Sequence, residues 1–74
     1  NANLFKVFPN PANDLITVSS LQRIDRLRLY NTLGQLVKEN FNSTTIQVST
    51  IDPGIYILKI ESGVSIETKK ILVN

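Results

Sequence analysis

The stretch "GIYILKI", residues Gly54 to Ile60, decides the fold class of this chain. Apolar residues fill both parities of the run, whereas an amphipathic helix would repeat them about every three or four positions. Successive side chains of a strand point to opposite faces, which gives two apolar sets: Tyr56, Leu58 and Ile60 on one face, Ile55 and Ile57 on the other. The run therefore predicts a strand in the middle of a sheet.

Similar runs lie on both sides of this strand. Alternating apolar residues predict strands that begin near residues 4, 14, 25, 35, 44, 54 and 65. This spacing is typical of a small antiparallel sandwich. A parallel pair would need a crossover of about 10 to 12 residues, and no helical run of that length is left. We predict one all-β domain over residues 1–74, an antiparallel β-sandwich of about seven strands.

Alternation also predicts which side chains face the core. In "RLRLY", Leu27 and Leu29 should face inward, and Arg26, Arg28 and Tyr30 outward. Ile16 should share a face with Val18, and Ile46 with Val48. The last strand carries apolar residues on both of its faces, with Ile66, Lys70 and Leu72 on one and Ile71 and Val73 on the other. The pattern leaves open which of them faces inward.

Turn residues separate the predicted strands, and all three glycines stand at such turns. "NTLG" ends in Gly34, "DPG" covers Asp52 to Gly54, and "ESG" ends in Gly63. In "FPNP", Pro9 and Pro11 fix φ and remove two backbone donors, so the first strand must end there. The predicted structural turn motifs are Pro9, Asn10, Pro11, Gly34, Asp52, Pro53 and Gly54.

Composition argues against several function classes. Eight basic and six acidic residues leave a net charge of +2, too weak and too dispersed for a nucleic-acid footprint. No run approaches the ~18 apolar residues of a membrane span. The chain has no Cys and no His, so it offers neither a disulfide, nor a zinc site, nor the usual activated nucleophiles. We expect no enzyme, no catalytic residue, no metal and no cofactor.

Three weaker motifs each have a structural alternative. Asn10, Asn13 and Asp14 would offer oxygens to calcium, or satisfy the backbone of their own turn. Asn42 begins a glycosylation-like "NST". The cluster of Arg23, Arg26 and Arg28 is a solvated strand face or a site for an anionic partner.

Four blocks in a fixed order carry a family resemblance: "FKVFPNPAND" (5–14), "LRLYNTLGQLVKE" (27–39), "IDPGIYILKIE" (51–61) and "TKKILVN" (68–74). Together they resemble the type A C-terminal sorting domain of the type IX (Por) secretion system, known from Bacteroidetes-type bacteria. The resemblance spans the whole chain. It departs from the family pattern at Asn31, where an acidic residue is frequent, and at Thr32 and Leu33, which fill the turn.

The resemblance implies an immunoglobulin-like sandwich that serves as a secretion signal. Its partners would be a covalently fused N-terminal passenger, the outer-membrane translocon, a shuttle protein and a sortase-like peptidase, which removes the domain or exchanges it for a surface anchor. The passenger would pass through the periplasm and end at the cell surface or outside the cell. The chain contains no Met and no signal-peptide layout, so we expect it to be a piece cut from a larger secreted precursor.

A sorting domain without catalysis would act through its surface. Its expected recognition residues are Gly54, Ile55, Tyr56, Lys69, Lys70, Ile71, Leu72 and Val73. A terminal strand at a sheet edge would allow another protein to add a strand. Alternatively, Ile55 and Tyr56 belong to the core, and Lys69 and Lys70 protect the edge from aggregation.

Two rival functions remain. A carbohydrate-binding or adhesin module would use exposed aromatic residues, for which Phe8, Tyr30 and Phe41 are the candidates. A plain structural spacer would need no particular surface at all.

Overall fold

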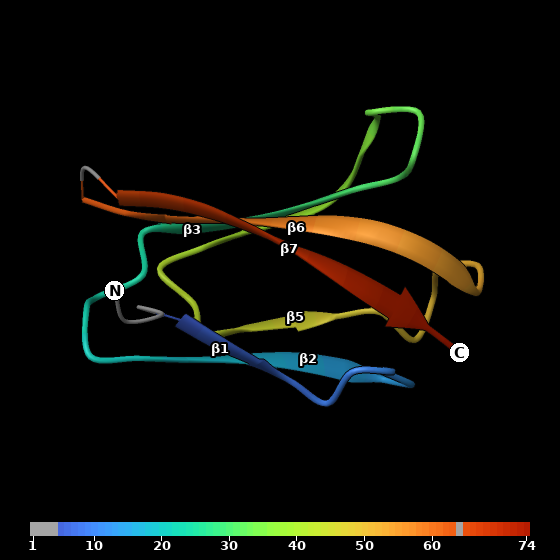
Figure 1. The fold of residues 1–74 in the computed structure, drawn as a ribbon, viewed down its shortest axis with the longest axis horizontal. Coiled ribbons are helices and arrows are strands. Elements are labelled where there is room, and N and C mark those ends of the chain that lie inside the picture. Colours follow the sequence, from blue (N-terminus) through green and yellow to red (C-terminus); the bar gives the residue numbers. More distant parts are fainter. Residues whose placement is uncertain (1–4, 64) are drawn as a thin grey trace.

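A computed structural model describes residues 5–63 and 65–74, and these residues form seven strands and no helix (Figure 1). The strands are β1 (Phe5–Phe8), β2 (Leu15–Ser20), β3 (Arg26–Tyr30), β4 (Leu36–Phe41), β5 (Thr45–Gln47), β6 (Gly54–Ser62) and β7 (Ser65–Val73). The all-β prediction is confirmed. The strand predicted to begin near residue 4 is described only from Phe5, since Leu4 lies outside the described residues.

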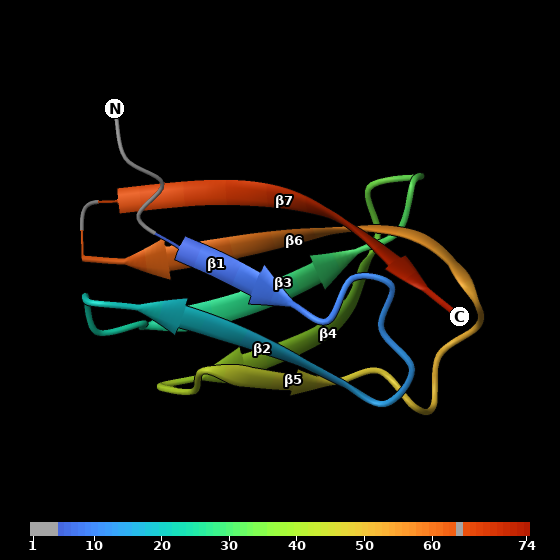
Figure 2. The same ribbon diagram turned by 60° about the horizontal axis from the view of Figure 1, so that its bottom comes forward.

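The strands form two antiparallel sheets that face each other as two layers (Figures 1 and 2). One sheet has the order β1-β2-β5 and the other the order β4-β3-β6-β7. This is an immunoglobulin-like sandwich, in which sequential strands change sheets and the core lies between the layers. Strand β6 lies between β3 and β7, so the prediction of a central strand over Gly54 to Ile60 is confirmed.

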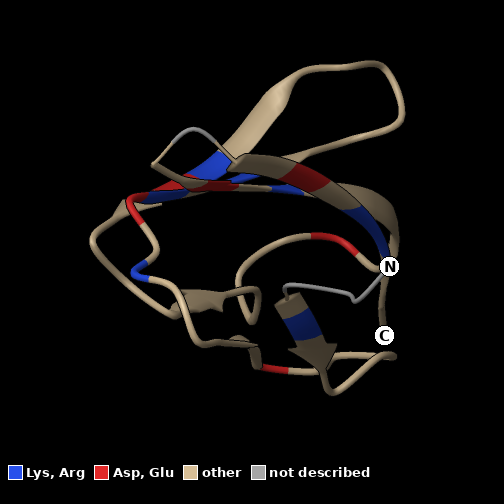
Figure 3. Cartoon of the chain, turned by 60° about the vertical axis from the view of Figure 1, so that its left-hand side comes forward, with Lys and Arg blue, Asp and Glu red and all other residues tan. Residues whose placement is uncertain are grey.

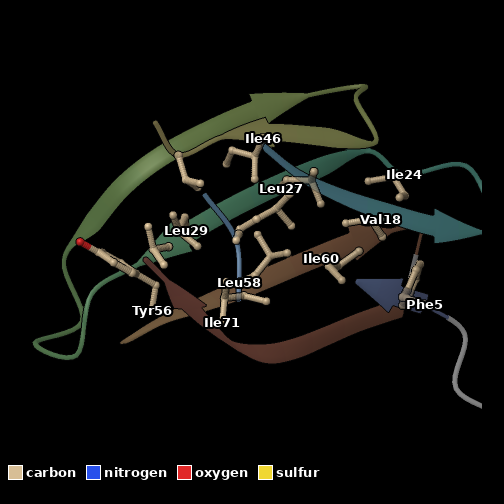
Figure 4. Close-up of a cluster of buried hydrophobic side chains, with 14 residues drawn as sticks. Phe5, Val18, Ile24, Leu27, Leu29, Ile46, Tyr56, Leu58, Ile60 and Ile71 are labelled. Atoms are coloured by element: carbon tan, nitrogen blue, oxygen red, sulfur yellow. The ribbon is translucent and has the colours of Figure 1, made fainter. Parts of the chain in front are cut away.

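The core consists of side chains from the inner faces of both sheets (Figure 4). Phe5 and Tyr56 lie at opposite ends of this cluster, and Leu27, Leu58 and Ile60 lie between them (Figure 4). Leu27 and Leu29, which were predicted to face inward, are buried. Both pairs predicted to share a face, Ile16 with Val18 and Ile46 with Val48, are buried as well. In β7, Ile71 and Val73 are buried while Ile66 and Leu72 are exposed, which settles the parity that the sequence left open.

The two apolar sets of β6 differ in burial. Tyr56, Leu58 and Ile60 are buried, whereas Ile55 is 47% exposed and Ile57 is half-buried. The reason is that the sandwich has two layers, so that β6 is covered on the face of Leu58 but its opposite face is the outer surface of the molecule.

The chain crosses from one sheet to the other directly after β1. Strand β1 pairs with β2, and beyond the prolines Ala12 forms a parallel bridge with Val73 of β7. The Ala12 amide donates to the Leu72 carbonyl at 2.8 Å, and the Asn74 amide donates to the Ala12 carbonyl at 2.9 Å. The segment from Pro9 to Ala12 therefore lies along the outer edge of β7.

Candidate functional site

The residues proposed for recognition lie side by side on β6 and β7, but they point in two directions. The register pairs Gly54 with Val73, Ile55 with Leu72 and Tyr56 with Ile71. The buried members are Tyr56, Ile71 and Val73, the exposed ones are Ile55, Lys70 and Leu72, and Gly54 and Lys69 are intermediate. Only the exposed members offer their side chains fully to a partner.

Tyr56 ties the connection between β5 and β6 to the core. Its side chain is 8% exposed, and its hydroxyl donates to the carbonyl of Asp52 at 2.5 Å. A tyrosine near the start of this strand that bonds to the backbone just upstream is a hallmark of immunoglobulin-like sandwiches. Gly54, between the two residues, has φ 153°. This geometry gives the Asp52 to Tyr56 segment a structural role.

Strand β7 lies at the edge of its sheet, but half of that edge is covered. Asn10 binds it with its amide side chain, since Nδ2 donates to the Lys70 carbonyl at 3.2 Å and Oδ1 accepts from the Leu72 amide at 3.0 Å. We call these contacts, together with the Ala12 backbone bonds, the clasp. Strand addition at Leu72 would have to displace it.

In the other half of β7, two charged side chains lie on the inward face of the strand. Glu67 and Lys69 share the parity of buried Ile71 and form an ion pair at 2.7 Å. Charged residues that point inward on an edge strand, and segments that cover an edge, both protect a sheet from pairing with another chain. The edge of β7 therefore has two protective features, one in each half.

Charged residues of both signs gather on the four-stranded sheet (Figure 3), and the register places Arg26, Arg28, Glu39 and Glu61 on its outer face. Arg26 binds Glu61 at 2.7 Å and Arg28 binds Glu39 at 2.9 Å. Longer contacts of 4.0 Å and 3.7 Å cross-link the two pairs. The hydrogen bond from Arg26 holds the pKa of Glu61 below its usual value. We call these four contacts the ion-pair lattice. It gives each carboxylate of this face, Glu39 and Glu61, an arginine partner.

Beside the lattice, the same outer face is apolar. Tyr30 lies between Leu36 and Ile57 in the register, and Ile55 pairs with Leu72. We call Leu36, Tyr30, Ile57, Ile55 and Leu72 the apolar band, which runs across all four strands of the sheet.

Leu36 and Ile57 were not among the recognition residues expected from the sequence. For Ile57 the signal was its place on the parity of Ile55, opposite Leu58. Leu36 alternates with Lys38 and Asn40, and it shares the face of Tyr30 only because the register shifts between Leu29 and Tyr30, which no local pattern shows.

The candidate aromatic residues do not form one platform. Phe8 lies on the three-stranded sheet, while Tyr30 and Phe41 lie on the four-stranded one. The guanidinium of Arg26 stands over the Phe41 ring at 5.7 Å from its centroid. Sugar-binding faces depend on exposed, grouped aromatic rings, so the geometry gives that function little support.

In the remaining polar motifs, the bonds of Asn10, Asp14 and Asn42 go to distant parts of the chain and not to their own turns. Asn10 belongs to the clasp, and the Asp14 carbonyl accepts a bond from the Val48 amide at 2.7 Å. Asn42 is exposed at the turn before β5, and its side chain accepts from Arg23 at 3.4 Å. Within residues 5–63 and 65–74, no cluster of Asp and Glu could hold a metal ion. The same residues contain no helix able to span a membrane.

Comparison with known protein families identifies the family of the chain. A family model described as "Secretion system C-terminal sorting domain" matches residues 6–74. The matched region begins in β1 and includes the clasp, both sheets and the end of β7. No curated protein matches the chain at a significant level.

Proposed function

This chain belongs to the family of type IX secretion C-terminal sorting domains, and from that premise we propose that it directs a passenger, fused to its N-terminal side, across the outer membrane. The match over residues 6–74 is the observation that carries the proposal, because it covers the whole sandwich. The motifs of the family are thus parts of one folded unit. The exported passenger would reach the cell surface or the surrounding medium.

The steps before and after translocation belong to the same proposal. The precursor would enter the periplasm first, meet a shuttle protein and the translocon, and lose the domain to a sortase-like peptidase. The domain has no Cys or His, so the nucleophile would come from the peptidase. Phe5 is buried in the core. A cut that leaves the sandwich folded would therefore lie before Phe5.

Within the domain, we assign the two groups of candidate residues different roles. Ile55, Lys70 and Leu72 are exposed on neighbouring strands and would meet the secretion machinery with their side chains. Tyr56, Ile71 and Val73 are buried and would hold the surface in shape. Gly54 would shape the turn before this surface, and Lys69 would hold the β7 edge through its ion pair with Glu67.

A reporter fusion tests the proposal. A reporter with an N-terminal signal peptide and this chain at its C-terminal end is expressed in a bacterium with a working type IX system. We expect the reporter at the surface or in the medium, shortened by about the 8.3 kDa of the domain. In a matched strain without the translocon, it should stay in the periplasm at full length.

Three results would contradict the proposal or one of its parts. Retention of the reporter in both strains would rule out a sorting signal. Equal secretion with the domain moved to the middle of the precursor would favour a spacer. Export of an unshortened reporter would remove the peptidase step and leave sorting in place. Binding of a glycan by the fusion, measured by calorimetry, would support the carbohydrate-binding alternative only if sorting failed.

A further inference from the structure

The outer face of the four-stranded sheet combines the apolar band with two lysines outside the ion-pair lattice. We propose that the band, with Lys59 and Lys70, docks a partner protein whose contact surface is apolar at its centre and carries carboxylates. The inference rests on the proposed sorting function, since the partner would be a component of the export machinery. It adds Leu36, Tyr30, Ile57 and Lys59 to the surface.

The first argument is the exposure of the band. Leu36, Ile55 and Leu72 are 51%, 47% and 42% exposed, and Tyr30 and Ile57 are half-buried between them. The residues belong to four different strands that lie next to each other in the sheet. Scattered single apolar residues are normal on a surface, but a contiguous apolar patch marks an interaction site.

The second argument is the charge of this face, which decides the chemistry of the partner. Four cations, Arg26, Arg28, Lys59 and Lys70, share it with two carboxylates, Glu39 and Glu61. The other four cations of the chain are balanced by its other four carboxylates, so the whole net charge of +2 belongs to this face. Because Arg26 and Arg28 already pair with Glu61 and Glu39, Lys59 and Lys70 supply the uncompensated charge.

Charge also decides against two other occupants. A second copy docked through the same face would bring two positively charged surfaces together, and like charges across an interface oppose association. A membrane surface recognised by charge takes clusters of about four to eight basic residues, and this face offers two free lysines. A protein with carboxylates around an apolar centre complements both features of the face.

The outer face of the three-stranded sheet supplies a natural control. Its outward positions on β2 and β5 are mostly neutral and polar, for example Thr17, Thr45 and Gln47. Leu15 is 43% exposed there, which matches the exposure of the band residues. Lys6 on β1 is an exposed lysine on the same sheet. Substitutions of Leu15 and Lys6 therefore make the same kinds of change in polarity and charge, one site at a time, away from the proposed surface.

The test uses the reporter fusion and measures the fraction of reporter exported. One variant combines Leu36→Thr with Ile55→Thr, and a second combines Lys59→Glu with Lys70→Glu. We expect each to lower export by about tenfold, since a few well-placed side chains carry most of the energy of an interface. Leu15→Thr and Lys6→Glu are the matched controls and should export like the parent. Lys59→Arg with Lys70→Arg should also export normally.

Leu36→Thr by itself separates this proposal from recognition through the β7 edge, since β4 and β7 lie at opposite edges of the sheet, and it should also lower export. Normal export of Leu36→Thr with Ile55→Thr would overturn the proposal. Loss of export in the parent fusion would overturn the sorting function itself, and the two failures are thus distinct. Protease resistance of each fusion shows whether the domain is folded. If the Leu36→Thr, Ile55→Thr variant is unfolded, the export of the Lys59→Glu, Lys70→Glu variant tests the proposal instead.

Two further measurements test the excluded occupants on the same fusion. Light scattering should show that the fusion is a monomer. A dimer whose stability changes in the Lys59→Glu, Lys70→Glu variant would show that a second copy, and not another protein, occupies the face, which would overturn the choice of partner. Co-sedimentation with vesicles of phosphatidylcholine and phosphatidylglycerol should show no binding. Binding that Lys59→Glu with Lys70→Glu abolishes would replace the protein partner with a lipid surface and overturn the proposal.

Discussion

The amide of Ala12 donates a hydrogen bond of 2.8 Å to the carbonyl of Leu72, and so joins the beginning of the domain to its last strand. This contact places the segment after β1 on the edge that strand addition would use. The half of the edge near the end of β7 is therefore covered by the chain itself, and a partner would reach this half of β7 through its outward side chains.

The clasp should stabilise the domain. Asn10→Ala removes the two side-chain bonds to the Lys70 carbonyl and the Leu72 amide, and we expect a loss of about 1 kcal/mol in the free energy of unfolding. Urea denaturation of the chain measures it. Asn13→Ala is the control, because its side chain makes no hydrogen bond to the described residues, and equal stability of both variants would contradict a role for the clasp.

Tyr56 should contribute to the stability of the domain and not to the recognition surface. Tyr56→Phe keeps the buried ring and removes only the bond to the Asp52 carbonyl, which should cost about 1 kcal/mol of unfolding free energy. Tyr30→Phe, on the outer face, should cost less. We expect Tyr56→Phe to export normally while the fold persists, and loss of export by a fully folded Tyr56→Phe would instead identify its hydroxyl as a recognition group.

Glu61 should make the domain sensitive to acid. The Arg26 hydrogen bond lowers its pKa below the usual 4.5, so the folded state favours the ionised form. The resulting stabilisation is complete above pH 4.5, and it is lost as the pH falls through the lower, folded-state value. Glu61→Gln should show a smaller fall of the thermal midpoint between neutral and acidic pH than the parent chain. Superimposable pH profiles would refute this.

Gly34 should be required for the backbone of the β3 to β4 hairpin. Its φ is 84°, and a Cβ there would meet no atom within 4 Å, so a substitution is penalised by the backbone alone. The Asn31 side chain fixes the turn by accepting bonds from the amides of Leu33 and Gln35, each at 3.0 Å.

We therefore expect Gly34→Ala to cost about 1 kcal/mol, and Gly34→Asn to cost less, since asparagine tolerates this region. Thermal unfolding of both variants gives the comparison. If alanine proves as stable as glycine at position 34, the positive φ is not needed by the turn.

The period of two along the chain was enough to determine the all-β class and, for each strand, which residues share a face. In the strand with Leu27 and Leu29, only one of the two alternating sets is aliphatic, so the burial of these two leucines could be assigned before the strands were paired. The family resemblance came from the sequence as well, because the motifs are local and their order is fixed along the chain.

Tertiary structure decided what alternation leaves open. Ile55 and Ile71 are equally apolar in the sequence, yet one is exposed and the other buried, because only the face toward the second sheet is covered. The prolines predicted a stop, but the clasp on β7 depends on residues far apart in the chain. The apolar band likewise exists only once β4, β3, β6 and β7 lie side by side, since each strand contributes no more than two of its residues.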